Sequence, residues 1–345
     1  MPWRDWLTAQ WSHPTLAGSL LLRPSAGVYG ALVATRQAMH RGGLLKARRL
    51  PVPVLVVGNL VVGGAGKTPA VIALVDWLRA SGWTPGVVSR GYGRRSRAVH
   101  VLAPQDSAEL VGDEPLLILR RCGVPVAVGA DRVEAARALL KARSAVNILV
   151  ADDGLQHLRL ARDIEIIVVD ARGVGNGRCL PGGPLRATLP TQPPPQSLLL
   201  YSHGAASLAW PGHIGTRQLA GVLPWAEWRD GARPAPDSWA ALRGCPVIAA
   251  AGLARPEAFF AMLRDQGLQT HPCPLPDHHD FATAPWPADS ADVVVTEKDA
   301  VKLSPERFGA SRVWVAPLDF QLPLSFCQAL AQRLAELPKT RSAPP

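Results

Sequence analysis

The sequence predicts an α/β protein, with a mostly parallel sheet covered by helices on both faces and a smaller C-terminal α/β domain after it. Three observations support this prediction. Short β-branched runs alternate with helical patterns along the chain. Motifs rich in glycine or acidic residues follow several of these runs, at the sheet edge where ligands of such folds bind. The length of 345 residues suggests two domains.

The first predicted strand and helix enclose a phosphate-binding turn. Val54–Val57 is an apolar run, and the apolar spacing after Pro69 predicts a helix. The turn between them contains Gly63, Gly64, Ala65, Gly66, Lys67 and Thr68. Backbone N–H groups of such a turn cradle phosphates, helped by the helix N-terminus. We expect Lys67 to reach the β- and γ-phosphates and Thr68 to ligate Mg²⁺, which indicates a P-loop NTPase-like, nucleotide-binding domain.

Further patterns complete the first domain, which we place at residues 46–197. A proline-rich stretch at residues 190–195 ends the alternation. Strands are predicted at Val87–Ser89, Val124–Val128, Asn147–Ala151 and Ile164–Asp170, and helices at Pro115–Arg121 and Val133–Lys141.

A connector at residues 198–225 and a smaller α/β domain at residues 226–337 follow. Two strands, Leu198–Tyr201 and Arg217–Val222, are assigned to the connector. The smaller domain is predicted from strands at Val247–Ala251, Val293–Thr296 and Val313–Ala316 and a helix at Pro256–Gln266. Residues 338–345 are expected to be a disordered tail.

Acidic pairs follow two of these patterns. Asp152 and Asp153 end an apolar strand, where P-loop enzymes hold Mg²⁺. Adjacent carboxylates are costly unless a cation or donors compensate them. We therefore expect Asp152, Asp153 and Thr68 to hold the metal. Asp113 and Glu114 precede a helix, a pattern that is also common for simple capping.

Two loops are candidate binding segments. The turn Ser89–Arg97 combines glycines with arginines that can clamp phosphates, although a solvated basic loop fits equally well. Residues 172–186 form a long loop rich in glycine and proline, and such loops tend to be functional. The run Asp277–Asp280 suggests metal ligands, but its donors are adjacent rather than spaced along one helix face, so zinc is not expected.

Composition narrows the class of protein. The net charge is +10, and residues 1–50 hold seven basic residues and one acid. Their apolar, tryptophan-bearing pattern fits a helix lying on an anionic membrane surface at residues 1–45, and it fits equally a helix packed on the core. No run has the roughly 18–20 apolar residues of a membrane span. A secretory signal is not expected either, because the charges are spread through the segment and Pro14 and Pro24 interrupt it. We find no nucleic-acid module, and five scattered cysteines suit a reducing cytosol.

Taken together, the motifs resemble one family, tetraacyldisaccharide 4'-kinase, the lipid A kinase of Gram-negative bacteria. The matching segments run in order across about 250 residues. They are GNLVVGGAGKTP (58–69), SRGYGR (89–94), VGDEP (111–115), DDGLQH (152–157), GNGRCLPGGPLR (175–186), AGLARPEAFF (251–260), DHH (277–279) and TEKDAVK (296–302).

The resemblance implies a reaction and a set of partners. The γ-phosphate of ATP is expected to move, with Mg²⁺, to the 4'-hydroxyl of a tetraacyl glucosamine disaccharide 1-phosphate, giving lipid IVA. The N-terminal segment resembles the family's membrane-docking helix, which implies a peripheral position on the cytoplasmic face of the bacterial inner membrane. A monomer is expected. The active site is expected in the cleft between the two domains.

The resemblance also implies residue roles. Asp113 corresponds to the base on the sugar hydroxyl and is paired with His278, while Lys67 serves the phosphates. Residues expected to contact the substrate are Arg90, Tyr92, Glu114, Gln156, His157, Asn176 and Arg186. The chain departs from the family's pattern at Val61, Ala65 and Ala187.

Two other classes share part of the pattern. A membrane-docking P-loop switch or partitioning ATPase would hydrolyse ATP without a lipid acceptor, but it leaves the Gly-Asp-Glu-Pro and Asp-His-His segments without a role. A non-catalytic lipid-surface protein would carry the loop as a vestige.

Overall fold

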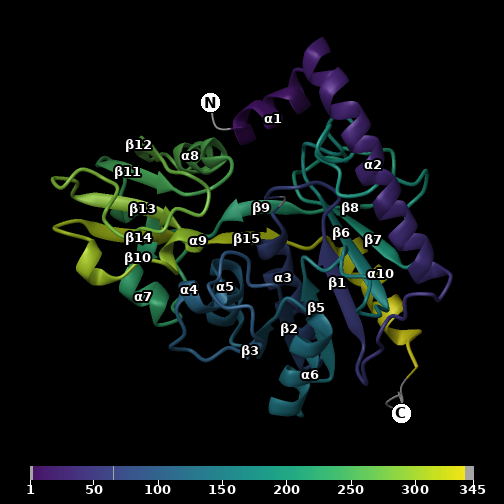
Figure 1. The fold of residues 1–345 in the computed structure, drawn as a ribbon. Coiled ribbons are helices and arrows are strands. Elements are labelled where there is room, and N and C mark those ends of the chain that lie inside the picture. The colour runs from purple at the N-terminus through teal and green to yellow at the C-terminus, as the bar shows by residue number, and fades with distance from the viewer. Residues whose placement is uncertain (1–2, 65, 339–345) are drawn as a thin grey trace.

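The computed structural model describes residues 3–64 and 66–338 and confirms the α/β class. Two sheets and a two-stranded ribbon make up its β structure, and helices cover the sheets (Figure 1). Ala65 and residues 339–345 lie outside the described part of the chain. The expectations for Ala65 and for the tail beyond Pro338 therefore stay predictions.

The larger sheet is parallel except at one edge. Its strand order is β3-β4-β2-β5-β1-β6-β7-β8, and only β3 runs antiparallel to its neighbour. The strands are β1 (Val54–Gly58), β2 (Pro85–Ser89), β3 (His100–Val101), β4 (Val126–Val128), β5 (Ile148–Asp152), β6 (Ile164–Val169), β7 (Ser197–Tyr201) and β8 (His213–Ile214). The carboxyl ends of β2, β5, β1 and β6 therefore lie side by side.

Helices cover both faces of this sheet because its central strands are apolar on both sides. In β1, Leu55 and Val57 join the cluster that contains α3 and α5, whereas Val54 and Val56 join the cluster of α6. The helices of this domain are α3 (Lys67–Ala80), α4 (Ala108–Val111), α5 (Asp113–Cys122) and α6 (Arg132–Ala142).

The smaller domain is built on a second sheet with the order β10-β14-β13-β11-β12. Its strands are β10 (Leu223–Pro224), β11 (Pro246–Ala251), β12 (Gln269–Pro274), β13 (Asp292–Thr296) and β14 (Arg312–Ala316). Its helices are α7 (Trp225–Arg229), α8 (Pro256–Asp265) and α9 (Glu297–Ala300), with 3-10 turns at Ser238–Ala241 and Pro305–Arg307. One apolar cluster contains buried residues of both domains, such as Leu74 and Val295, so their cores are continuous.

The connector differs from the sequence-based expectation. Strand Leu198–Tyr201, assigned there to the connector, lies in the larger sheet, where β7 pairs in parallel with β6. The observed connector is a ribbon of β9 (Thr216–Leu219) and β15 (Leu318–Gln321) that crosses between the domains (Figure 1). The chain then returns to the first domain as α10 (Leu324–Ala335), whose Phe326 and Leu330 are fully buried in the continuous core.

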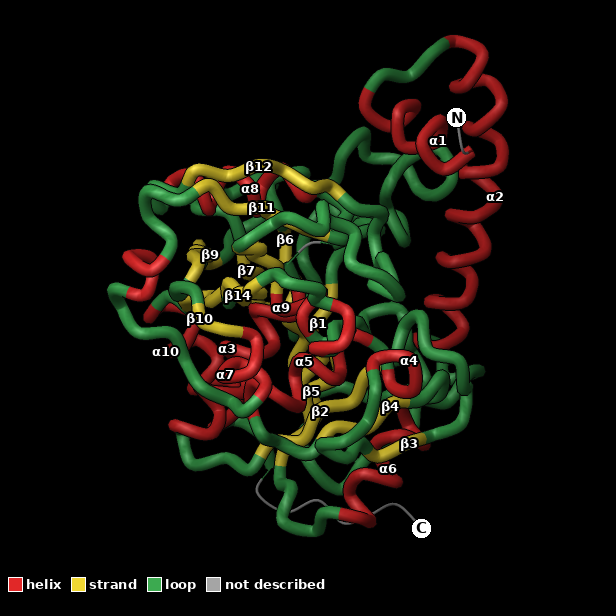
Figure 2. Tube along the Cα trace, turned by 90° about the vertical axis from the view of Figure 1, so that its left-hand side faces the viewer, coloured by secondary structure: helices red, strands yellow, loops and turns green. Residues whose placement is uncertain are grey.

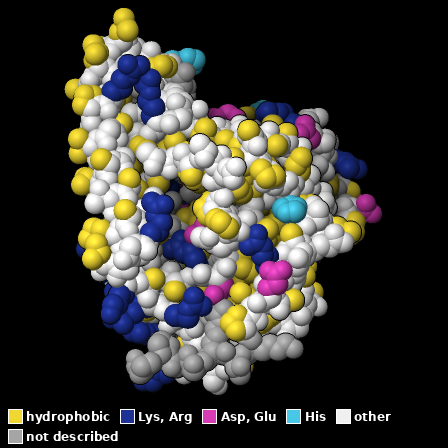
Figure 3. Space-filling model, turned by 90° about the vertical axis from the view of Figure 1, so that its right-hand side faces the viewer, with side chains coloured by type: hydrophobic (Ala, Val, Ile, Leu, Met, Phe, Trp, Pro, Cys, Tyr) yellow, Lys and Arg dark blue, Asp and Glu magenta, His cyan; other side chains and the backbone are white. Residues whose placement is uncertain are grey.

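The N-terminal segment forms two helices, α1 (Trp3–Ser12) and α2 (Leu16–Arg41), of which α2 projects beyond the sheet (Figure 2). Pro14 separates them, but Pro24 lies inside α2, so the expected interruption there is wrong. Within the described residues, α2 is long and apolar enough by length and composition to cross a membrane, contrary to the expectation from sequence, although its apolar residues form no unbroken run. Leu16, Leu20 and other apolar side chains of α2 are exposed, and hydrophobic atoms line its length (Figure 3).

Candidate functional site

The sequence motifs meet at one edge of the larger sheet. Asn59 follows β1, Asp152 ends β5, Ser89 ends β2 and Asp170 follows β6. Because these strands are neighbours and parallel, their carboxyl ends lie side by side at one edge of the sheet, next to the phosphate loop.

The phosphate loop is held in shape from below by Asn59. Its buried amide Nδ2 donates to the carbonyl of Val61 at 2.6 Å, and its Oδ1 accepts from Lys67 Nζ at 3.2 Å. Gly66 has a φ of 72°, a conformation that glycine adopts without strain, and it directly precedes α3. Gly63 and Gly64 are exposed, so their backbone is open to a ligand. The loop therefore brings Lys67 and the N-terminus of α3 together.

The two carboxylates at the end of β5 have different surroundings. Asp153 lies 3.5 Å from Lys67 Nζ and accepts hydrogen bonds from Arg186 at 2.9 and 3.1 Å. Burial alone raises the pKa of Asp153, but the charges of Lys67 and Arg186 outweigh it and hold that pKa below its usual range. Gln156 accepts a further bond from Arg186. The Arg186 side chain thus orients Asp153 beside the phosphate-loop lysine.

Asp152 is buried and only partly satisfied. Ser89 donates to its Oδ2 at 3.1 Å, while its Oδ1 has no hydrogen-bond partner among the described residues. Burial, together with the charges of Glu114 and Asp153, raises the pKa of Asp152 well above its usual range. A buried carboxylate oxygen without a partner is costly, and a divalent cation would satisfy it.

These residues fit Mg²⁺, which takes one or two carboxylates and leaves its remaining positions to water and phosphates. Thr68 begins α3 beside Lys67 and is half-buried. No group of three or more His, Cys, Asp or Glu side chains suited to a metal occurs in the described residues. The run Asp277–Asp280, for which zinc was not expected, belongs to no such group.

The two domains meet at an acid–histidine pair. Asp113 opens α5 in the first domain, and its Oδ2 lies 3.1 Å from Nδ1 of His278 in the second. Gly112 has a φ of 95° and packs against the backbone of Gly91 and Tyr92, so the turn after β2 abuts the start of α5. The two motifs predicted to form the catalytic pair are therefore brought together.

Two lysines lie beside the Asp113–His278 pair, and neither was a candidate from the sequence. Lys298 Nζ lies 3.3 Å from Nε2 of His278, and Lys302 Nζ lies 3.7 Å from Oδ2 of Asp113. Burial alone raises the pKa of the Asp113 carboxyl. The His278 hydrogen bond and the charges of Lys302, His278 and Lys298 outweigh it, so that pKa lies below its usual range. Asp113 is thus held ionised, as a proton acceptor must be.

The tautomer of His278 follows from these contacts. An ammonium group donates only, so Nε2 accepts from Lys298 and Nδ1–H donates to Asp113 in the neutral ring. Both lysines come from the segment TEKDAVK, which was matched by resemblance but given no role. Their spacing of four residues was the available signal.

Of the remaining predicted substrate residues, some lie beside the Asp113–His278 pair and others lie away from it. Tyr92 is 60% exposed and its ring lies 5.2 Å from that of His278, while Glu114 lies 3.6 Å from Lys298. Arg90 is exposed. His157 lies near Asp131 rather than at the pair, and burial lowers its pKa to about 4.

Asn176 has a structural position. Its Nδ2 donates to the carbonyl of Gly182 and its Oδ1 accepts from the backbone N–H of Arg178. These bonds hold the loop before Arg186 in shape, so the side-chain amide is already engaged within its own loop.

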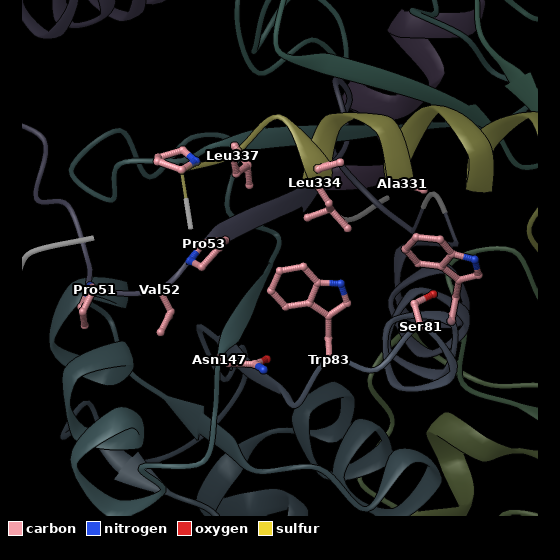
Figure 4. A pocket seen from close by; sticks show the side chains of 12 residues that line it. Pro51, Val52, Pro53, Ser81, Trp83, Asn147, Ala331, Leu334 and Leu337 are labelled. Carbon is pink, nitrogen blue, oxygen red and sulfur yellow. The ribbon is translucent and has the colours of Figure 1, made fainter. Parts of the chain in front are cut away.

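A hollow of about 650 Å³ lies elsewhere, at the amino end of β1. Trp83 and Pro53 face Leu334 of α10 across it (Figure 4), and Trp77 also lines it. None of the predicted site residues lines it, so this hollow and the motif-bearing edge are separate.

Comparisons with known proteins agree with the resemblance. Residues 18–335 match the family model described as tetraacyldisaccharide-1-P 4'-kinase. The chain is 48% identical over 98% of its length to a tetraacyldisaccharide 4'-kinase of Leptothrix cholodnii, covering 95% of that protein. It is 49% identical over 99% of its length to one of Methylibium petroleiphilum, covering 96%.

A solved structure is similar as well. It is the "apo" form of LpxK from Aquifex aeolicus in complex with ATP, with a TM-score of 0.76 and 27% identity. The match covers 93% of this chain and 99% of that one.

Proposed function

The chain belongs to the tetraacyldisaccharide-1-P 4'-kinase family, and from this premise we propose that the acid–histidine pair between its domains is the catalytic centre. The protein is an ATP-dependent kinase of lipid A biosynthesis that phosphorylates the 4'-hydroxyl of a tetraacyl disaccharide 1-phosphate. The observation that carries the proposal is the 3.1 Å contact between Asp113 and His278.

Asp113 is the base in this proposal. The 4'-hydroxyl oxygen attacks the γ-phosphorus of ATP, its proton passes to the Asp113 carboxylate, and ADP leaves. His278 orients the carboxylate through Nδ1–H, and Lys302 keeps it ionised. Phosphoryl transfer requires mainly positioning and charge neutralisation, which suits a base held among cations.

The phosphate loop and the end of β5 bind the nucleotide and its metal. Lys67 contacts the β- and γ-phosphates, and backbone N–H groups from Gly63 to Thr68 surround them. Asp152 and Thr68 would hold Mg²⁺, with Asp153 close by. Bound there, the ion neutralises charge on the phosphates.

Seven further residues are proposed to contact the disaccharide substrate, directly or by shaping its site. Tyr92 lies beside His278 and Glu114 beside Lys298, so both are close to the acceptor position. Arg90, Gln156 and His157 come from the loops after β2 and β5, at the same edge of the sheet. Asn176 shapes the loop that precedes Arg186, and Arg186 orients Asp153.

Helix α2 is proposed to dock the enzyme on the cytoplasmic face of the inner membrane as a peripheral monomer. Leu16, Leu20, Leu21, Val28 and Leu32 are each more than 60% exposed on it. Such a surface favours the boundary between headgroups and acyl chains, and flanking cations favour anionic lipid. The acylated substrate resides in the same membrane.

The proposal is tested by ATP turnover with and without the acylated disaccharide. Phosphate transfer that requires the lipid supports the kinase, whereas lipid-independent hydrolysis supports a switch or partitioning ATPase. Lys67→Ala is expected to abolish transfer, and unchanged transfer in that variant would remove the phosphate loop from the mechanism.

A further inference from the structure

A cluster of arginines surrounds the phosphate loop without being used in the mechanism above. Arg172 begins the long loop after β6, Arg217 lies on connector strand β9, and Arg255 precedes α8 of the smaller domain. Asp170, which is fully buried in its side chain, pairs with Arg172 at 2.8 Å and with Arg255 at 3.1 Å. One carboxylate therefore faces three guanidinium groups.

Arg172 and Arg255 have evident structural partners. Besides pairing with Asp170, Arg172 donates to the carbonyls of Val62 and Gly64 at 3.3 and 3.2 Å and so braces the loop. Arg255 joins the smaller domain to the end of β6 through Asp170. Neither guanidinium needs a ligand to account for its position.

Arg217 is different. Its Nη2 lies 3.2 Å from Nδ1 of His203, and within residues 3–64 and 66–338 it makes no ion pair with a carboxylate. Burial lowers the pKa of its guanidinium, Asp170 raises it, and Arg255 and Arg172 lower it further. Asp170 supplies one negative charge to three guanidinium groups, so a further anion beside Arg217 would be favourable.

The guanidinium of Arg217 lies directly against the phosphate loop. A Cβ atom added to Gly66 would stand 2.8 Å from its Nη1, closer than real Cβ contacts allow. Gly66 immediately precedes α3, whose N-terminus and Lys67 attract phosphate. Arg217 thus comes to this position from outside the P-loop domain, and the absence of a side chain at Gly66 is what admits it.

The strand that carries Arg217 is well placed to hold it there. In the β9–β15 ribbon Arg217 pairs with Phe320, whose side chain is buried, and β15 packs against α3. A guanidinium on a packed strand is more precisely held than one on a loop. Its planar fork also matches phosphate oxygens better than a lysine does.

We propose that Arg217 binds the polyphosphate of the nucleoside triphosphate, so that the interdomain connector supplies a cation to the phosphate loop. This rests on the proposed function, because it takes the loop to be the nucleotide site. Cations supplied to a transferring phosphoryl group from outside the loop are a recurrent device of P-loop enzymes. The contact between Arg217 and the polyphosphate also joins the connector directly to the ligand that both domains enclose.

The test is titration calorimetry of the full-length protein with ATP, ADP and AMP, without lipid acceptor. Arg217→Gln is expected to weaken ATP and ADP binding about 10- to 100-fold, the loss of one hydrogen-bonded charge pair. AMP binding is expected to change less than about twofold, since the contact is to the β- and γ-phosphates. Arg217→Lys keeps the charge without the fork and should give an intermediate loss.

The matched control is Arg233→Gln. Arg233 lies 3.8 Å from Asp76. Asp76 is on α3, ten residues beyond Gly66, which places it about 15 Å along the helix. Its replacement removes the same charge and should leave ATP affinity within about twofold. Thermal unfolding without nucleotide identifies any variant that fails to fold, in which case Arg217→Lys decides.

Unchanged ATP affinity in folded Arg217→Gln and Arg217→Lys would overturn the inference. The same titration with Lys67→Ala separates the two levels of the argument. If Lys67→Ala loses ATP binding while the Arg217 variants keep it, only the role of Arg217 is rejected. If Lys67→Ala and the Arg217 variants all keep ATP binding, the phosphate-loop assignment itself is rejected.

Discussion

The buried ion pair between Arg121 and Glu297 should hold the two halves of the catalytic cluster together. Arg121 lies in the last turn of α5, the helix that Asp113 begins, and Glu297 begins α9, next to Lys298. Their side chains are 6% and 5% exposed, and Nη1 lies 2.6 Å from Oε2. Breaking this pair should therefore both destabilise the protein and misplace the base.

The expected magnitude follows from burial. Among the described residues, Arg121→Met leaves Glu297 with the donors of Trp228 and Leu318. Removing one partner of a buried pair typically costs about 3–5 kcal/mol. For a chain of this size, an unfolding entropy of about 0.7 kcal/mol per kelvin converts that into a fall in melting temperature of about 4–7 °C. A displacement of about 1 Å at the base lowers kcat by about 10²-fold.

Calorimetric melting and turnover with the lipid acceptor measure the two effects. The control is Arg137→Met, which breaks a pair with Glu134 whose side chains are about half exposed. Such surface pairs contribute about 0–1 kcal/mol, so that variant should melt within about 1–2 °C of the parent. If Arg121→Met melts no lower than this control, the pair does not join the domains and the reasoning fails.

Three further predictions concern the base, the metal and the membrane. Lys302→Gln removes a charge 3.7 Å from Asp113. Because the pKa of Asp113 then rises, the acid limb of the kcat/KM profile should move to higher pH, and activity should return at pH values above that limb. An unmoved limb would exclude the lysine from tuning the base. Asp152→Asn should raise the Mg²⁺ concentration for half-maximal turnover at least about tenfold, and an unchanged Mg²⁺ titration would remove Asp152 from the metal. Leu20→Ser with Leu21→Ser should weaken binding to anionic vesicles about tenfold per leucine in flotation assays, and binding should fall with salt; equal flotation of parent and variant would place the membrane contact elsewhere.

The sequence predicted the elements whose pattern is local. Val54–Val57 is apolar on both faces, so it reads as a central strand, and the structure confirms it as part of β1. The phosphate loop and Asp152 could be assigned because nucleotide binding requires glycines, then a lysine, and later an acid at a strand end, in this order along the chain. Family resemblance then supplied the pairing of Asp113 with His278, which lie 165 residues apart.

What could not be predicted depends on long-range packing. Strand β12 (Gln269–Pro274) has an exposed, polar pattern because it lies at a sheet edge, and no apolar run marks it. Strand β7 was assigned to the connector because a proline-rich stretch precedes it, yet its fully apolar core fits the larger sheet. Pro24 was expected to interrupt the N-terminal segment, but α2 continues through it.

The roles of Lys298, Lys302 and Arg217 were equally hidden. Each is an ordinary basic residue in the sequence, and its meaning comes from the contact that folding creates. For Lys302 that contact is a carboxylate in the other domain. For Arg217 it is a glycine of the phosphate loop.

The most direct test of the central claim is single-turnover phosphate transfer by Asp113→Ala, measured beside its ATP affinity. If Asp113 is the base, transfer to the disaccharide should fall about 10²–10⁴-fold, while the dissociation constant for ATP stays within about twofold and the variant remains folded. Near-normal transfer by the folded variant would contradict the account, because the pair between the domains would then not be the catalytic centre.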